Sequence, residues 1–179
     1  TVSESSKRDI VQQYGLDPAK VHVIYEAAAP EFAPAPPEAV TRAQERYGLP
    51  ERFALHVGTI EPRKNLTRLV EALQRLRDRG LIIPLVVVGG KGWLYEGFFQ
   101  RLEELEVRHD THFPGYVAAE DLPAVYSAAT LTVVPSVYEG FGLPVLEAMS
   151  CGVPVACSDR SSLPEVGGDA ALYFDLYDE

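Results

Sequence analysis

Two periods of hydrophobic residues alternate along most of the chain. Short apolar runs typical of strands lie at 53–57, 84–88, 131–134 and 153–157, with weaker candidates at 111–113 and 170–174. Between these runs, apolar residues recur every three or four positions, as in amphipathic helices, over 66–76, 95–105, 122–129 and 143–149. Alternating strands and helices predict a parallel sheet with helices on both faces, which buries both sides of nearly continuous apolar strands. The pattern therefore predicts an α/β fold with a parallel sheet.

The N-terminal part of the chain has a different pattern. Apolar residues at Ile10, Val11 and Tyr14 predict a short helix, and the run 21–25 predicts a strand. The stretch Ala27–Val40 is typical of a linker because it carries Pro30, Pro34, Pro36 and Pro37. We therefore place a domain boundary after 1–36, which end in this Pro-rich linker, and assign 37–179 to the α/β domain.

The two ends of the chain also suggest a part of a longer protein. The sequence begins at Thr1 without a Met and stops just after an apolar run. We therefore expect the α/β domain to be truncated at its C-terminal end.

The composition of the chain limits the kinds of partner that it can bind. The chain has 179 residues, is 46% hydrophobic and carries a formal net charge of −10, which suits a globular domain and disfavours nucleic acid and anionic membranes as partners. The most apolar stretch, 81–90, is about half of what a membrane helix needs. Cys151 and Cys157 form no metal-type pair, and no secretory signal precedes them, so we expect a reduced, cytoplasmic setting.

The histidines are not spaced as metal ligands, either with one another or with a cysteine, so we expect no metal site. His56 lies in the first predicted strand of the α/β domain. We expect it to be a core histidine with its hydrogen bonds satisfied.

A first candidate loop for chemistry is Gly58–Asn65. It follows a predicted strand, and ligands bind beyond the carboxyl ends of strands in open α/β sheets. Asn65 is a suitable N-cap for the next helix, which places Arg63 and Lys64 beside free amides and a dipole that favour an anion. Two interpretations stay open, a diphosphate site and a solvated basic loop.

A second candidate is the glycine-rich loop Gly89–Trp93. Gly90 allows close approach of a ligand to the backbone and Lys91 adds charge, but the loop lacks the frame of a Walker sequence. The alternative is a flexible turn with Trp93 packed over the core as a lid.

The third candidate, 135–149, is chemically the richest. Gly140 and Gly142 precede an apolar helix that starts near Leu143, so backbone amides there would point toward a ligand. Glu147 lies about one turn into that helix and leans back toward its N-terminus, where a carboxylate can accept hydrogen bonds from a ribose diol. The alternative, two acids that favour the helix dipole, explains Glu139 poorly because Glu139 lies outside the helix.

Part of this loop imitates a dinucleotide-binding fingerprint. Gly140 and Gly142 follow a strand, and Asp159 follows the next one. Val145 occupies the position of the third glycine, however, and the loop is long for that motif. The sequence therefore disfavours a nicotinamide or flavin site.

Taken in order, these motifs resemble glycosyltransferase family 4, whose members have two facing Rossmann-like domains (the GT-B fold) and retain the anomeric configuration. The spacing from Glu139 to Glu147 matches the E-x7-E motif of that family, 62–65 its phosphate loop and 89–93 its glycine loop. The segments 161–165 and 168–171 are similar to bacterial mannosyl- and rhamnosyltransferase-like members, and 2–9 resembles the end of the first domain. The resemblance runs nearly end to end.

The resemblance also implies roles for individual residues. Arg63 and Lys64 would contact the donor diphosphate, Glu147 the ribose hydroxyls and Glu139 the transferred sugar, which makes Glu139, Arg63 and Lys64 the expected catalytic set. The other expected donor-binding residues are Gly58, Gly90, Lys91, Gly140, Phe141, Gly142 and Leu143. The family usually needs no metal, and we expect no cofactor. An Arg/Lys pair beside a helix N-terminus can stabilise the departing diphosphate as a metal otherwise would.

The implied function is transfer of a hexose from a nucleoside diphosphate sugar, GDP-mannose or a UDP-sugar, to a glycan or lipid-linked acceptor in polysaccharide biosynthesis. Acceptor contacts and any membrane contact, at the inner face of the membrane, would come from the first domain, so we expect this chain alone to be inactive. A noncatalytic nucleotide- or sugar-binding module in an assembly complex is the alternative.

Overall fold

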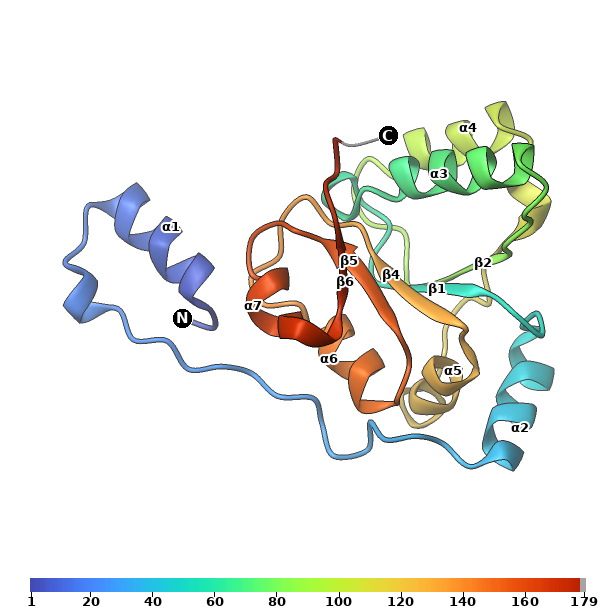
Figure 1. Cartoon of the computed structure of the whole chain (residues 1–179), viewed down its shortest axis with the longest axis horizontal. Helices are drawn as coiled ribbons and strands as arrows, with labels where there is room; N and C mark the ends of the chain where they lie inside the picture. Colours follow the sequence, from blue (N-terminus) through green and yellow to red (C-terminus); the bar gives the residue numbers. More distant parts are fainter. Residues whose placement is uncertain (178–179) are drawn as a thin grey trace.

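A six-stranded sheet forms the centre of the computed structural model, which describes residues 1–177. The strands are β1 (Ala54–Val57), β2 (Leu85–Val88), β3 (Thr111–His112), β4 (Leu131–Val134), β5 (Val155–Ser158) and β6 (Leu172–Phe174). They lie in the order β3-β2-β1-β4-β5-β6, and every neighbouring pair is parallel. The predicted Rossmann-like sheet is confirmed, with all six strands at the expected places (Figure 1).

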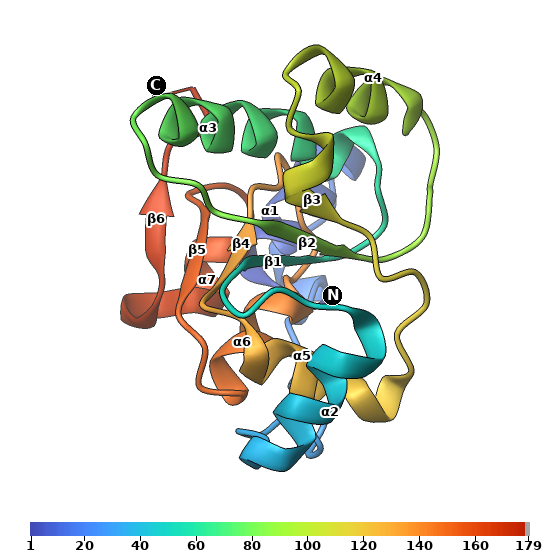
Figure 2. The same cartoon turned by 90° about the vertical axis from the view of Figure 1, so that its right-hand side faces the viewer.

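Helices cover both faces of the sheet, as predicted. Residues 1–177 contain the helices α1 (Glu4–Tyr14), α2 (Pro37–Tyr47), α3 (Leu66–Asp78), α4 (Glu96–Glu104), α5 (Leu122–Ala128), α6 (Leu143–Ser150) and α7 (Leu163–Gly167). Figure 2 shows α3 and α4 on one side of the sheet and α2, α5 and α6 on the other. Along β2, Leu85 and Val87 belong to the core beneath α3 and α4, whereas Val86 and Val88 belong to the core beneath the other helices. This double burial explains the uninterrupted apolar sequence of the strand.

The strand order reverses direction at β1 and β4. From β1 the chain proceeds outward to β2 and β3, and from β4 it proceeds outward the other way to β5 and β6. Because parallel crossovers are right-handed, this reversal puts the connecting helices of the two halves on opposite faces. The loops after β1 and β4 therefore diverge at their start and leave a crevice at the carboxyl edge of the sheet, where doubly wound folds bind ligands.

The N-terminal segment differs from prediction in one element. The predicted helix is present as α1, but the predicted strand at 21–25 is wrong, since these residues form no strand. A strand needs hydrogen-bond partners along its backbone, and within residues 1–177 the backbone contacts of 21–25 to another segment are made with Thr1. Thr1 donates through its amino group to the carbonyl of His22, 2.8 Å away, and accepts at 2.9 Å from the amide of Ile24.

Two helices were not anticipated from the apolar pattern. Helix α2 begins at Pro37, inside the stretch whose prolines indicated a linker, and proline is well suited to the first turn of a helix. Helix α7 has five residues, which is too short to reveal a helical period. Both helices join the core through small or apolar side chains, Ala43 in α2 and Leu163 in α7.

Helix α1 lies apart from the layers of the domain (Figure 1) and contacts it through its N-terminal end and through Asp9, which accepts from the Tyr138 hydroxyl at 2.8 Å. The amides of Glu4 and Ser5 donate to the carboxylate of Glu165 in α7, at 2.7 and 3.2 Å. The hydroxyl oxygens of Ser3 and Ser6 lie 2.7 and 3.0 Å from the carbonyl oxygen of Gly140. The first residues of the chain are thereby attached to the loop that follows β4.

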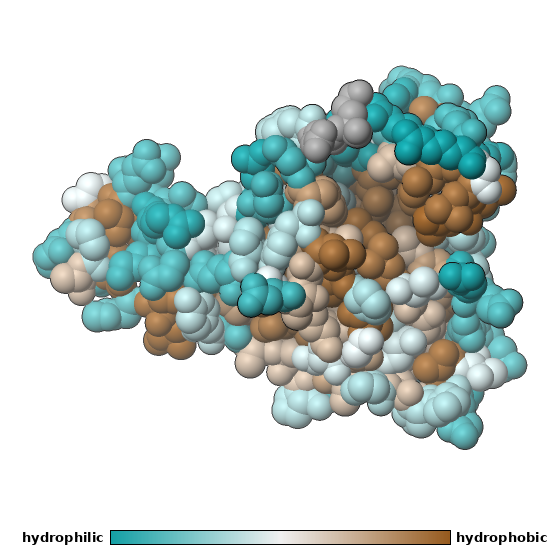
Figure 3. Space-filling view, viewed as in Figure 1, coloured by the Kyte–Doolittle hydropathy of each residue, from teal (hydrophilic) through white to brown (hydrophobic). Residues whose placement is uncertain are grey.

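An apolar groove of about 950 Å³ runs between α3 and the open face of β4, β5 and β6, and Figure 3 shows apolar residues gathered there. Its lining includes Leu69, Leu73, Val133, Ala156 and Phe174. No helix among residues 1–177 is both long and apolar enough to cross a membrane.

The backbones of β1 and β2 approach each other closely just beyond their carboxyl ends, at Gly58 and Gly89. This packing predicts how a substitution there changes the stability of the chain. A Cβ atom on Gly89 would lie 2.1 Å from the carbonyl oxygen of Gly58, and the φ of Gly89 is +149°. We expect Gly89→Ala to lower the free energy of unfolding by about 2–4 kcal/mol, because the backbone of both strands would have to move. Urea denaturation followed by circular dichroism measures the change.

The neighbouring glycine supplies the control. A Cβ atom on Gly90 would meet nothing within 4 Å, so Gly90→Ala should stay within about 0.5 kcal/mol of the wild type. Equal stability of the two variants would contradict the packing described for β1 and β2.

Candidate functional site

Two loops meet in the crevice at the reversal of strand order. The first runs from Gly58 at the end of β1 through a 3-10 turn, Pro62–Lys64, to α3. The second runs from Pro135 at the end of β4 to Gly142 before α6. The amide of Val137 donates to the carbonyl of Arg63 at 2.9 Å and joins the loops through their backbones.

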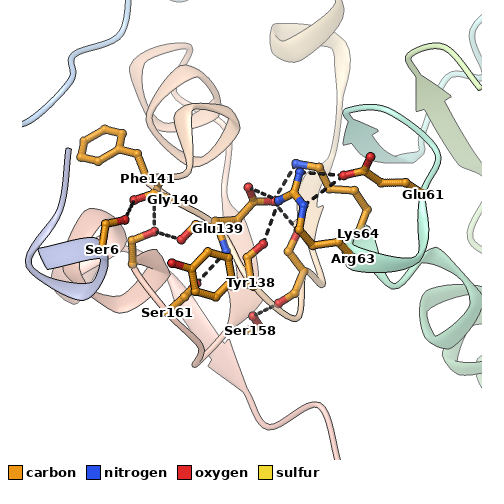
Figure 4. A network of polar contacts seen from close by, with 12 residues as sticks. Ser6, Glu61, Arg63, Lys64, Tyr138, Glu139, Gly140, Phe141, Ser158 and Ser161 are labelled. Carbon is orange, nitrogen blue, oxygen red and sulfur yellow. Dashed lines mark hydrogen bonds and ion pairs between the residues drawn. The ribbon is translucent and has the colours of Figure 1, made fainter. Parts of the chain in front are cut away.

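Glu139 is the centre of the polar contacts between these loops (Figure 4). One carboxylate oxygen, Oε1, accepts from Lys64 Nζ at 2.6 Å and from Ser136 Oγ at 2.6 Å. The other oxygen, Oε2, accepts from a guanidinium nitrogen of Arg63 at 2.7 Å. The three residues expected to be catalytic thus form one cluster, and Glu139 is 7% exposed within it.

The two cations differ in access to solvent. The side chain of Lys64 is 9% exposed, whereas that of Arg63 is 38% exposed and also pairs with Glu61 at 2.7 Å. Two cations face two carboxylates, so the cluster is close to neutral as it stands. Lys64 uses one of its three N–H donors on Glu139, which leaves donors for a further acceptor. The structure therefore shows a paired network rather than a bare solvated basic loop.

The same contacts also shift the pKa values of Glu139 and Arg63. Burial alone would raise the pKa of Glu139, but the hydrogen bonds from Lys64 and Ser136 outweigh it and lower that pKa below its usual value. Burial would lower the pKa of Arg63, and its contacts with Glu139 and Glu61 raise it instead. The carboxylate and the guanidinium both remain charged at neutral pH.

Serines hold the backbone of the second loop in place, and the sequence analysis did not single them out as site residues. The amide of Glu139 donates to Ser161 Oγ at 2.8 Å, and its carbonyl accepts from Ser162 Oγ at 2.9 Å. Ser158 Oγ donates to the carbonyl of Ser136 at 2.6 Å. Ser136 and Ser158 each lie at the carboxyl end of a strand, and that position was the available signal.

Next to Glu139, the chain presents unpaired backbone donors. The amides of Gly140, Phe141, Gly142 and Leu143 have no acceptor within residues 1–177. Gly142 has a φ of +116°, and a Cβ there would lie 2.9 Å from Leu163. At Gly140 the nearest atom to such a Cβ is 3.9 Å away, so neighbouring protein atoms do not require this glycine. A glycine at position 140 does, however, leave room for a ligand to approach the backbone.

Phe141 and Leu143 complete this stretch of expected donor-binding residues. The side chain of Phe141 is 7% exposed, and its ring lies 6.2 Å from that of Tyr25. Its carbonyl lies 2.5 Å from Ser162 Oγ. Leu143 is partly buried and begins α6, whose second position is Pro144, as expected. Phe141 and Leu143 therefore offer their amides, not their side chains, to a polar ligand.

Glu147 has a hydrogen-bond partner in the predicted helix 122–129 that was not an expected site residue. The hydroxyl of Tyr126 in α5 donates to Glu147 Oε2 at 2.6 Å. Burial raises the pKa of Glu147, and the hydrogen bond from Tyr126 acts in the opposite direction. A half-buried acid on an apolar helix is thus satisfied by a phenol.

Other residues of the candidate loops lie differently from expectation. The amine of Lys91 lies over the rings of Tyr95 and Phe99, 4.9 Å from each centroid, and so faces α4. Trp93 is 62% exposed and does not cover the core. Asn65 occupies the N-cap position of α3, but its side chain makes no capping hydrogen bond because its backbone is left-handed, with a φ of 54°. The backbone of the glycine loop still contacts the first loop, where Ile60 pairs with Lys91.

His56 is only half satisfied, contrary to the expectation. Its Nδ1 lies 3.0 Å from the carbonyl of Val133 and its Nε2 is buried without a partner. Burial lowers the pKa of His56 to about 4, and a weak opposing effect comes from Val133. Nε2 is 3.2 Å from the place where a Cβ of Gly58 would lie, and Lys64 Cε is 3.3 Å from it. The expected donor-binding residue Gly58 is therefore needed for internal packing.

Among residues 1–177, the other candidates for chemistry are side chains that could bind a metal ion and the two cysteine thiols. Across residues 1–177, no three His, Cys, Asp or Glu side chains gather in a way that could hold a metal ion. Cys151 and Cys157 are buried free thiols, and burial raises the pKa of each to about 11. Such thiols are poor nucleophiles at neutral pH.

The fold is that of a Rossmann-like domain of the type found in GT-B glycosyltransferases. The chain belongs to the family described as glycosyl transferases group 1, whose profile matches residues 39–174. It is 41% identical to O-antigen chain mannosyltransferase B of Escherichia coli, over 99% of this chain and 47% of that protein. It is 30% identical to O-antigen chain mannosyltransferase RfbU of Salmonella typhimurium, over 100% of this chain and 47% of that protein. The chain thus spans about half the length of these relatives.

Solved structures agree on the fold. The structure of Alr3699/HepE from Anabaena, in complex with UDP and glucose, superposes with a TM-score of 0.82 at 22% identity. The alignment covers 97% of this chain and 48% of that one. The predicted GT-B type of domain is confirmed by this similarity.

Burial of His56 predicts a pH dependence of stability. The pKa of His56 is about 4 in the folded chain and about 6.5 when unfolded, so the unfolded state binds more protons between these values. The free energy of unfolding should therefore fall as the pH falls from about 6.5 toward about 4, by on the order of 1 kcal/mol per unit. Urea denaturation at a series of pH values measures the slope.

The variant His56→Gln should lose most of that slope, because its side chain does not titrate. His22 is exposed, so His22→Gln is a matched control and should keep the slope. An unchanged slope in the His56 variant would show that other groups cause the pH dependence.

Proposed function

We propose that this chain is the donor-binding half of a retaining glycosyltransferase that moves a hexose from a nucleoside diphosphate sugar. The observation that carries the proposal is the cluster of Glu139, Arg63 and Lys64, which lies in the crevice beside the free amides of 140–143. Membership in the glycosyl transferases group 1 family supports the reaction class.

The diphosphate would lie between the cations of the first loop and the amides of the second. Cleavage of the sugar–phosphate bond leaves negative charge on the departing diphosphate, and preorganised donors stabilise that charge. Arg63 and Lys64 are held in place before a ligand arrives because Glu139 already orients both. With these cations and four amides, the site needs neither a metal ion nor another cofactor for this task.

The other expected site residues would contact the nucleotide and the transferred sugar. Glu147 would accept hydrogen bonds from the ribose hydroxyls, and Glu139 would contact the transferred sugar from the loop. Gly58 and Gly90 would let the nucleotide approach the backbone, and Lys91 would have to leave the rings of α4 to reach it. Retention would use a front-face route, because the other carboxylate of the cluster among residues 1–177, that of Glu61, is engaged by Arg63.

The sugar and the acceptor are proposed from the relatives. Two relatives carry the name O-antigen chain mannosyltransferase, so we propose mannose as the hexose, GDP-mannose as the donor and a glycan or lipid-linked acceptor. We also propose that 1–36 connects a first domain, which binds the acceptor, to the donor-binding domain at 37–179. The attachment of Ser3 and Ser6 to Gly140 would then link that first domain to the donor loop. The protein would act in the cytoplasm, at the inner face of the membrane where the acceptor is lipid-linked.

Calorimetric titration with UDP, GDP and ADP tests the proposal on the full-length protein. We expect micromolar to millimolar binding of at least one of them, and weaker binding of the matching nucleoside. Arg63→Met should remove about 1.5–3 kcal/mol of that binding because a charge-assisted contact to phosphate is lost.

Arg42→Met is the matched control, because Arg42 is exposed on α2 and the substitution changes the net charge equally. It should leave binding unchanged. If a folded wild-type protein binds none of the nucleotides, the proposal is wrong.

Measurements of turnover distinguish the effect of a substitution on catalysis from its effect on nucleotide binding. We expect Arg63→Ala to lower kcat by about 10²–10³, comparable to loss of an oxyanion donor, because leaving-group charge develops in the transition state. Glu147→Ala should mainly weaken nucleotide binding, since ribose contacts are equal in the ground and transition states. Steady-state kinetics with a sugar donor measure both, and equally small effects would contradict the assignment.

A further inference from the structure

We propose that Tyr126 is a positioning residue for nucleotide recognition, whose buried hydroxyl fixes one carboxylate oxygen of Glu147 and leaves the other to a ribose diol. The inference rests on the proposed function, because it assigns how Glu147 is presented to the ribose. It adds a residue from α5, an element that contains none of the expected site residues.

Tyr126 is held more firmly than a surface tyrosine. Its side chain is 0% exposed, and its ring packs edge-on against Phe32 with 5.9 Å between centroids. The hydroxyl donates to Glu147 Oε2 at 2.6 Å. Burial, together with the nearby charge of Glu147, raises the pKa of Tyr126 well above its usual value, so the phenol stays protonated. It can therefore act as a constant donor.

The geometry leaves Glu147 with one engaged and one open oxygen. Its Oε1 has no protein hydrogen-bond partner among residues 1–177. The buried side-chain atoms without a partner in this part of the chain lie on His56, Gln74, Thr132 and Arg160, so Oε1 of Glu147 is not enclosed. An open, rigidly oriented carboxylate oxygen accepts from a ligand hydroxyl without first losing rotamer freedom.

The hydrogen bond from Tyr126 also favours the form of Glu147 that can accept. Burial favours the neutral acid, and the hydrogen bond from Tyr126 favours the carboxylate. A protonated Glu147 would offer one acceptor fewer and would point a proton at the ligand. Tyr126 thus contributes to both the orientation and the charge of the group that contacts the diol.

A purely structural role for Tyr126 is the competing explanation, because a buried phenol needs a hydrogen-bond partner in any case. The two roles differ in what they do to ligand selectivity. A positioning role affects the preference for ribose over deoxyribose, whereas a structural role affects the binding of both alike.

The experiment compares UDP, GDP and ADP with their 2′-deoxy and 3′-deoxy counterparts by calorimetry on the full-length protein. We expect the wild type to prefer the ribonucleotide. Tyr126→Phe should reduce that preference about three- to tenfold, the usual range for one hydrogen bond, and should leave binding of the deoxynucleotide nearly unchanged. Glu147→Gln should reduce the preference at least as much.

Tyr47→Phe is the matched control, since the Tyr47 hydroxyl also donates to a carboxylate, that of Asp121 at 2.7 Å, away from the crevice. It should leave the preference intact. Thermal melts of each variant verify folding.

The outcomes separate the two proposals. Loss of preference in Glu147→Gln but not in Tyr126→Phe overturns the role of Tyr126 and leaves the proposed function standing. Equal weakening of both nucleotide forms in Tyr126→Phe shows a structural role and also overturns the inference. Absence of nucleotide binding in the folded wild type overturns the proposed function and this inference with it.

Discussion

The carboxylate of Glu139 is the constraint on which the candidate site depends. It holds Lys64, which is almost enclosed, and Arg63, which is partly open to solvent, and both come from a loop about 75 positions away in sequence. A buried ammonium without such a partner is costly. The pairing therefore fixes the loops after β1 and β4 at the one place where the strand order reverses.

This arrangement produces a site that is preorganised yet close to neutral. The cations are oriented by protein carboxylates, while the serines at 136, 158, 161 and 162 hold the backbone around Glu139. Hydrogen-bond donors for a diphosphate would therefore be oriented before it binds, including the free amides at 140–143. The acidic surface, with a net charge of −10, makes such a local cluster necessary for any anionic ligand.

Sequence reasoning recovered the sheet and the residues of the central cluster because strand periodicity and loops at strand ends are local signals. It failed at 21–25, where strand formation depends on a neighbouring strand, and at Asn65, whose left-handed backbone prevents capping. It also missed the contact between Tyr126 and Glu147, and the unpaired Nε2 of His56. Such contacts depend on packing between elements distant in sequence, which no local pattern records.

A double-mutant cycle on Lys64→Met and Glu139→Gln, measured by urea denaturation, tests the central claim most directly. Glu139→Gln leaves the buried ammonium of Lys64 without its counter-charge, and we expect it to lose about 3–5 kcal/mol of unfolding free energy. Lys64→Met should lose less, because Glu139 keeps its contacts with Arg63 and Ser136. The double variant should lose clearly less than the sum, with a coupling of about 1–3 kcal/mol. Additive losses, or single variants as stable as the wild type, would contradict the claim that this ion pair holds the two loops together.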